Sequence, residues 1–169
     1  MSKLLLIVFL LFSIGAAAQS ATYFGRDLVA APATESSIRA DFVNSQKALL
    51  CENCDDSLSG KVQWLDEGPD LVVKAFARMQ NGPKFCFRDI IFSFDLVFTN
   101  REGLSRLELR NIQYNLLQAG TSACTGSGTL EALRSSDCCK TYSNIDAYFE
   151  QYFNKIYLRY KKALKAGSR

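Results

Sequence analysis

The sequence predicts an α+β domain: a four-stranded antiparallel sheet flanked by a helix at each end of the chain. Between Gly60 and Leu116, apolar and polar residues alternate, which is the pattern of strands half buried on one face. On either side of that stretch, apolar residues recur every three or four positions, as they do in amphipathic helices. Because the strands follow one another through short turns, we expect a meander with both helices on one face.

The N-terminus has the layout of a secretory signal peptide over residues 1–18. Lys3 precedes an apolar run that ends in Ala16–Ala17–Ala18, and the run is too short to span a bilayer. We expect cleavage after Ala18, a single α+β domain over residues 19–169, and no transmembrane segment after cleavage. The expected location is secreted or periplasmic.

The charge of the chain excludes one class of partner. The net charge is +3, and it falls to +2 once Lys3 is removed. A nucleic-acid-binding protein needs a larger, clustered excess, so we expect no nucleic-acid partner. The basic residues that do cluster lie near the C-terminus. We interpret them as cations favoured by a helix dipole, with contact to an acidic partner or surface as the alternative. They are Lys155, Arg159, Lys161, Lys162, Lys165 and Arg169.

The N-terminal part of the domain predicts a short strand at Thr22–Phe24 and then a helix. Pro32 opens the helix and Thr34 is a suitable N-cap. One apolar face continues up to Cys51. Its residues are Ile38, Phe42 and Leu49, with Val43 and Leu50 beside them.

Four strands are then predicted. The first contains Val62 and Trp64, and the second runs from Leu71 to Met79. The third has the clearest alternation, from Ile90 to Phe98, and the fourth begins at Leu104. Turn-forming residues separate them at 66–69, 81–83 and 100–103.

The apolar positions of the fourth strand change phase along its length. Leu107 and Leu109 are odd-numbered, whereas Ile112 and Tyr114 are even-numbered. Since a one-residue slip exchanges the buried and exposed faces of a strand, we predict a β-bulge near Arg110–Asn111.

The C-terminal part of the chain predicts a long loop followed by the strongest helix. Residues 118–141 are rich in Gly, Ser and Thr, and we expect their three cysteines to pin them, with a short helix near Leu130–Arg134. Ser143 and Asp146 resemble a capping box. The helix that follows carries an apolar face long enough to require burial against the sheet. Its residues are Ile145, Tyr148, Phe149, Tyr152, Phe153, Ile156, Tyr157 and Tyr160.

The layout of the chain resembles a family of small exported bacterial domains of unknown function that have a TBP-like fold. The matching features are Gly60–Lys61–Val62, the aromatic strand that follows, and a Gly-x-x-Arg exit at Gly103–Arg106. The resemblance covers residues 34–114 and the C-terminal helix. Leu104–Ser105 and the cysteine-bearing loop depart from the family pattern. The resemblance implies a sheet with helices on one face and implies no activity. A cystatin-like fold is the alternative.

Six cysteines in an exported chain predict disulfides. They are Cys51, Cys54, Cys86, Cys124, Cys138 and Cys139. Six cysteines permit 15 pairings. We expect the Cys51/Cys54 segment to be bridged to itself or to the loop that holds Cys124, Cys138 and Cys139. A redox site is disfavoured because Cys51-x-x-Cys54 follows a helix and lies among acidic residues. A zinc site with Cys138 and Cys139 is the remaining alternative.

The chain contains no histidine. This excludes Ser-His-Asp and Cys-His catalysis and every metal site that uses a histidine ligand. We predict no catalytic, cofactor-binding or metal-binding residue, and no cofactor.

Four further motifs have ordinary structural interpretations. Carboxylates at 55, 56, 66, 67 and 70 match no calcium loop and indicate solvated turns. Thr125–Thr129 lacks the remainder of a P-loop and indicates a flexible loop. Asp89 and Asp95 are about 20 Å apart along one strand, which is too far for glycoside hydrolysis. We expect Trp64 in the core, with a ligand platform as the alternative.

These observations predict a non-catalytic binding or assembly module of the cell envelope, with an unknown protein or envelope partner. The candidate surfaces are the 118–141 loop and the helix-free sheet face. That face would carry Lys61, Gln63, Lys74, Arg78, Ser93, Asp95 and Thr99. The alternatives are a secreted enzyme (a hydrolase or a thiol-disulfide protein) and a carrier of small apolar ligands between the sheet and the C-terminal helix.

Overall fold

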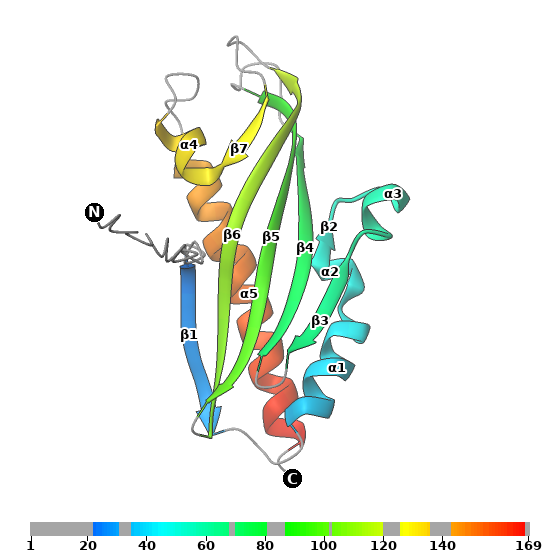
Figure 1. The fold of residues 1–169 in the computed structure, drawn as a ribbon, viewed down its shortest axis with the longest axis vertical. Helices are drawn as coiled ribbons and strands as arrows, with labels where there is room; N and C mark the ends of the chain where they lie inside the picture. The colour runs from blue at the N-terminus through cyan, green and yellow to red at the C-terminus, as the bar shows by residue number, and fades with distance from the viewer. Residues whose placement is uncertain are drawn as a thin grey trace, which may run out of the picture.

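A computed structural model describes residues 22–30, 35–67, 70–80, 87–101, 103–119, 126–135 and 143–167. Figure 1 shows an elongated sheet with the longest helix running behind it. The strands are β1 (Thr22–Ala30), β2 (Cys51–Glu52), β3 (Gln63–Glu67), β4 (Asp70–Gln80), β5 (Phe87–Arg101), β6 (Leu104–Ala119) and β7 (Ser127–Thr129). The helices are α1 (Glu35–Ser45), α2 (Lys47–Leu50), α3 (Asp56–Ser59), α4 (Leu130–Ser135) and α5 (Ser143–Gly167).

The sheet has seven strands, so the prediction of a four-stranded antiparallel meander is wrong for the sheet as a whole. The four predicted strands, β3 to β6, are consecutive antiparallel neighbours. β1 and β7 both pair with β6, and β2 and β3 both pair with β4. Since β2 runs parallel to β4, the sheet is mixed. The α+β class is confirmed.

The short added strands explain the error. β2 has two residues and β7 has three, which is too short for any alternation of apolar residues to show. β1 extends to Ala30, well past the predicted Thr22–Phe24. The prediction stopped too early because Gly25, Arg26 and Asp27 show no apolar pattern.

The predicted β-bulge is confirmed on β6. Asp95 of β5 pairs with Arg110, and Ser93 pairs with Gln113, so β6 holds one residue more than β5 between these pairs. Asn111 takes the left-handed backbone conformation, with φ of 53°. The extra residue lets Leu109 and Ile112 lie on the same buried face.

Both long helices pack on one face of the sheet, as predicted. Phe42 of α1 contacts the rings of Phe98 in β5 and Tyr160 in α5, with ring centroids 5.9 and 5.1 Å apart. Phe149 of α5 meets Phe92 and Phe94 of β5 edge-on, at 5.1 and 5.6 Å. One core cluster therefore joins α1, α5 and the central strands.

The first helix is divided, which the sequence did not predict. α1 ends at Ser45, and Gln46 has a non-helical backbone before α2 begins. This bend keeps Leu49 and Leu50 in the core while it turns the chain toward the sheet edge at β2. The predicted N-cap, Thr34, lies outside the described residues.

Two predicted irregular segments contain regular structure. In the 118–141 segment, Ser127–Thr129 forms β7 on the edge of β6, and the predicted short helix is confirmed as α4. In the predicted turn at 66–69, Asp66 and Glu67 extend β3, and Asp70 begins β4. The predicted turn at 81–83 lies outside the described residues. α5 begins at Ser143 itself, the residue predicted as its cap.

Among the described residues, no helix combines the length and the apolarity needed to cross a membrane.

Candidate functional site

β3 forms an outer edge of the sheet and carries two large exposed apolar side chains. Among the described residues, β4 is the strand that pairs with β3, and no strand pairs with its other side. Trp64 is 45% exposed and its neighbour Leu65 is 58% exposed. Because adjacent strand residues point to opposite faces, these side chains flank the free edge from both sides.

The prediction that Trp64 lies in the core is therefore wrong. Trp64 pairs with Val73, which is fully buried, so its phase in the strand agrees with a core position. Its position on an edge strand leaves the indole 45% exposed, and Trp64 belongs to neither core cluster of the described residues. The alternation of apolar and polar residues indicates which face of a strand is buried, but not where the strand lies in the order of the sheet.

The pairing of the strands places each of the two side chains at the end of a row of apolar residues that runs across the sheet. Leu65 pairs with Val72, which pairs with Val97, on the helix-free face. Trp64 continues the row of Val73 and Leu96 on the helix-covered face. An added strand would thus find an apolar side chain on each side of the edge.

Free strand edges in natural proteins usually carry a lysine, a proline or a bulge that blocks further pairing. Within Gln63–Glu67 the sequence is Gln-Trp-Leu-Asp-Glu, which has no lysine or proline, and the pairing of β3 with β4 is regular. The central residues present an edge suited to an extended polypeptide.

The segment before β3 crosses the edge of the sheet from one face to the other. Leu49 and Leu50 of α2 belong to the core under the helices. Leu58 of α3 instead packs with Phe76 on the helix-free face, in a second small cluster. β2 lies at the crossing point, where Cys51 pairs with Phe76. This crossing delivers the chain to the outer side of β4, where β3 begins (Figure 1).

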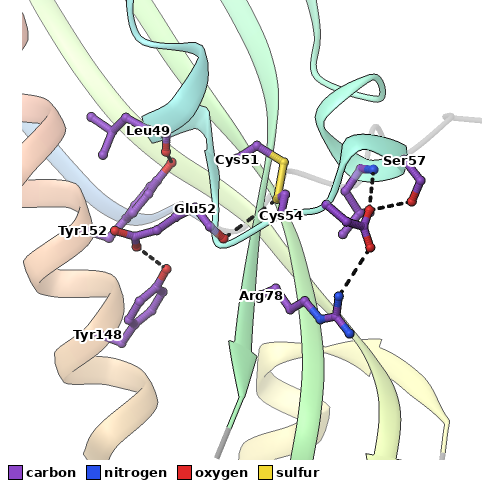
Figure 2. Close-up of a disulfide and its surroundings, with 10 residues drawn as sticks. Leu49, Cys51, Glu52, Cys54, Ser57, Arg78, Tyr148 and Tyr152 are labelled. Atoms are coloured by element: carbon purple, nitrogen blue, oxygen red, sulfur yellow. Dashed lines mark hydrogen bonds and ion pairs between the residues drawn. A yellow bond between two sulfur atoms is a disulfide. The ribbon is translucent and has the colours of Figure 1, made fainter.

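A disulfide closes the crossing between Cys51 and Cys54, with their Cα atoms 5.4 Å apart (Figure 2). Of the two predicted arrangements, the bridge within this segment is thus the one found. Asn53 between them has a φ of 56°, which completes a tight turn. Cys86, Cys124, Cys138 and Cys139 lie outside the described residues, so their pairing stays a prediction. The zinc alternative is wrong, because the sulfurs of Cys51 and Cys54 are bonded to each other and cannot serve as thiolate ligands.

The surroundings of the disulfide do not favour a thiolate. The short helix α3 is capped by Asp55, whose carboxylate accepts a hydrogen bond from the Leu58 amide at 3.1 Å. Hydrogen bonds from Ser57 and from the backbone, with the charge of Arg78, lower the pKa of Asp55. An ionised carboxylate, rather than a sulfur, therefore occupies the helix N-terminus, and it repels a second negative charge.

Glu52, inside the disulfide loop, binds the loop to α5. Its carboxylate accepts a hydrogen bond from the Tyr148 hydroxyl at 2.6 Å and contacts the Lys155 ammonium at 3.1 Å. One turn after Tyr148 on α5, the Tyr152 hydroxyl donates a hydrogen bond to the carbonyl of Leu49 at 2.9 Å (Figure 2). The crossing segment is thus held both by the disulfide and by the main helix.

Ion pairs occupy much of the helix-free face. Arg78 makes a two-fold contact with Asp89, at 2.9 and 2.5 Å, and also reaches Asp55 at 3.3 Å. The hydrogen bonds from Arg78 lower the pKa of Asp89. Asp95 accepts a hydrogen bond from Asn111 at 2.6 Å. Asp89 and Asp95 therefore have separate partners and do not act as a pair.

The centre of this face holds a nearly buried carboxylate between two arginines. Glu108 contacts Arg106 at 2.8 Å and also pairs with Arg110. Burial alone raises the pKa of Glu108, but the hydrogen bonds from both arginines outweigh it, and the net pKa is lowered. Asp27 of β1 pairs with Arg106 as well, at 2.8 Å. The network is charge-balanced, which makes it a structural feature rather than an ion-binding site.

The predicted outward residues are confirmed only in part. Lys61, Gln63 and Lys74 are exposed, and Arg78, Ser93 and Asp95 are half buried. Thr99 is buried, because it lies between Asp70 and Arg106 of the neighbouring strands.

The other predicted motifs do not form sites in the described ranges. No three His, Cys, Asp or Glu side chains come together there as a possible metal site. Asp70 pairs with Arg101 at 3.6 Å, away from Asp55. Ser127 to Thr129 forms β7, which corrects the prediction of a flexible loop at 125–129, although Thr125 is not described.

The described residues define an α+β protein with one helix-covered sheet face and, at β3, an edge strand with exposed apolar side chains. Comparison with protein-family models, with curated proteins and with solved structures found no match. The resemblance to exported TBP-like domains therefore stays a prediction.

Proposed function

We propose that this chain is an exported, non-catalytic binding module that accepts an extended segment of another polypeptide at the free edge of β3. The observation that carries the proposal is the pair Trp64 and Leu65, 45% and 58% exposed on an edge without a described partner strand. Backbone hydrogen bonds of the added strand would supply affinity, and the two apolar side chains would select apolar residues at two adjacent positions of that strand, one on each face of the sheet.

A non-catalytic role is supported by the chemistry that the chain provides. It has no histidine, and the acidic side chains Asp89, Glu108 and Asp55 are each paired with arginine. A thiol-disulfide role would need a reactive sulfur at a helix N-terminus, where Asp55 lies instead.

An apolar-ligand carrier is a weaker candidate. The space between the sheet and α5 is filled by aromatic rings in edge-on contact, including those of Phe94, Phe149 and Tyr152. Phe149 and Tyr152 are almost completely buried. A ligand there would have to displace them.

Export to the periplasm or the exterior, and a TBP-like rather than cystatin-like arrangement, are parts of the same proposal. The apolar N-terminal segment and the Cys51–Cys54 disulfide support export. Two helices on one face of a largely antiparallel sheet support the TBP-like arrangement. Export is tested by the mass of the protein recovered from the periplasm of a bacterial host. We expect a chain that begins at Gln19; a chain that retains Met1 in the cytoplasm contradicts export.

The strand-docking proposal is tested with peptides selected from a random display library on the immobilised protein. Trp64, the only tryptophan in the chain, reports on the edge. We expect selected peptides to shift its emission to shorter wavelength and to shield it from acrylamide. Leu65→Lys should abolish their binding, since a lysine on an edge blocks pairing.

The matched control is Leu104→Lys, because Leu104 is 52% exposed and lies on β6, away from the edge. This variant should bind the selected peptides as the unchanged protein does. Failure to select any peptide, or equal binding by Leu65→Lys, would overturn the proposal.

A further inference from the structure

A groove of about 670 Å³ lies between α1 and the C-terminal half of α5, the two long helices that cover one face of the sheet. Each helix contributes one face to it, with residues spaced by three and four positions. Its lining residues are Ile38, Asp41, Phe42, Ser45, Gln46, Arg159, Lys162, Ala163 and Ala166. The two alanines leave space where larger side chains would bring the helices into contact.

The groove has an apolar floor and polar walls. Ile38, Phe42, Ala163 and Ala166 supply the apolar surface. Arg159 closes one end by donating to the side-chain carbonyl of Gln46 at 2.7 Å. A site of this kind suits a molecule with an apolar chain and a charged head.

The charge around the groove is mainly positive. From Gln151 to Gly167, α5 contains five basic residues and no acidic residue. The helix-dipole interpretation accounts for only one of them, because Lys165 is the single basic residue in the last turn. Lys155 pairs with Glu52, and Lys161 lies 5.6 Å from the centre of the Tyr157 ring.

Lys162 and Lys165 are exposed and form no ion pair with a described residue. On the same outer side of α5, Leu158 is 62% exposed, one turn before Lys162. Asp41 is the acidic residue that lines the groove, and it offsets only part of this charge. The surface therefore combines unpaired cations with apolar groups, which is the composition of helices that lie on anionic membranes.

We propose that this surface docks on an anionic phospholipid bilayer. The phosphate groups would lie at Lys162 and Lys165, and one acyl chain would enter the groove over Phe42 and Ala166. This inference does not depend on strand docking at β3, since the two surfaces share no residue.

The test is binding of the purified chain to vesicles of phosphatidylglycerol mixed with phosphatidylcholine, measured by sedimentation. We expect binding that requires the anionic lipid and weakens as salt is added. Each lysine removed near the surface should lower the partition coefficient about five-fold, so Lys162→Gln with Lys165→Gln should lower it about 25-fold. The control, Lys61→Gln with Lys74→Gln, removes the same charge from exposed positions on β4 and before β3, and should bind normally.

A second variant, Ala166→Leu, fills the groove from an exposed position and leaves the charge unchanged. It should weaken binding to vesicles, because the acyl chain loses its place. Equal weakening by both lysine pairs would mean that net charge alone attracts the protein, and would overturn the inference. Unchanged binding by Ala166→Leu would overturn the role of the groove. Binding to soluble decyl phosphate without binding to vesicles would contradict the assignment to a membrane.

Discussion

Glu52 is the residue that connects the disulfide loop to the body of the protein. It lies between the two bridged cysteines, and its side chain points to the helix-covered face, where Tyr148 and Lys155 meet it. Burial, with the hydrogen bond to Glu52, raises the pKa of Tyr148. The neutral phenol is therefore the form that the fold favours, and it donates to the carboxylate.

Tyr148→Phe should destabilise the protein by about 1.5–3 kcal/mol, the range for a hydrogen bond to a charged group. The measurement is urea unfolding. Tyr157→Phe is the control, since Tyr157 makes a longer hydrogen bond, 3.4 Å, in an exposed position. Equal losses in both variants would mean that the contact with Glu52 contributes nothing specific.

Glu108 should make stability sensitive to acid. Its pKa is lowered in the folded protein, so the carboxylate contributes stability above the ordinary glutamate pKa of about 4.3, and this contribution disappears as the pH falls through the folded value. Glu108→Gln should thus be less stable than the unchanged protein at neutral pH, and the difference should shrink below about pH 4. A difference in unfolding free energy that is constant with pH would contradict this account.

At the scale of elements, β6 depends on its bulge to keep two apolar series on one face. Asn111 occupies the left-handed region, which side chains branched at Cβ avoid. Asn111→Val should be less stable than Asn111→Gly by about 1–2 kcal/mol, since both lose the hydrogen bond to Asp95 and only valine strains the backbone. Chemical denaturation measures the difference. Asn115→Val, outside the bulge on the same strand, should cost little; if it costs as much as Asn111→Val, bulge strain is not the cause.

At the scale of elements, the disulfide holds in place the segment that crosses the sheet edge before β3. Replacing both Cys51 and Cys54 by alanine should cost about 2 kcal/mol by the loop-entropy estimate for so short a ring. Hydrogen exchange should accelerate from β2 through α3 and β3, and stay slow in β5 and α5. Uniform acceleration across the chain would mean that the bridge supports the whole fold and not this segment.

At the scale of the whole molecule, the sequence correctly predicted those structural elements that depend on long periodic patterns. The alternation from Ile90 to Phe98, the phase change near Asn111 and the apolar face of α5 each involve many residues, so β5, the bulge and the helix were predicted correctly. β2 and β7 are too short to carry a pattern. Their pairing depends on which chain segments lie beside β4 and β6, which local sequence does not encode.

The candidate site at the β3 edge was not predicted from the sequence, for the same reason. Trp64 has the sequence pattern of a core residue, and only the strand order places it on an edge. The exposure of both Trp64 and Leu65 follows from the position of β3. Neither the composition of the sequence nor any motif in it distinguishes such an edge strand from a central strand.

The most direct test of the account is acrylamide quenching of Trp64 in the purified protein, recorded over a range of protein concentrations. A free β3 edge predicts emission at long wavelength and efficient quenching in the absence of a partner, with protection only when a docked peptide is added. Emission at short wavelength, with an indole shielded even at the lowest concentration, would mean that Trp64 is already covered, and would contradict the edge as the binding site.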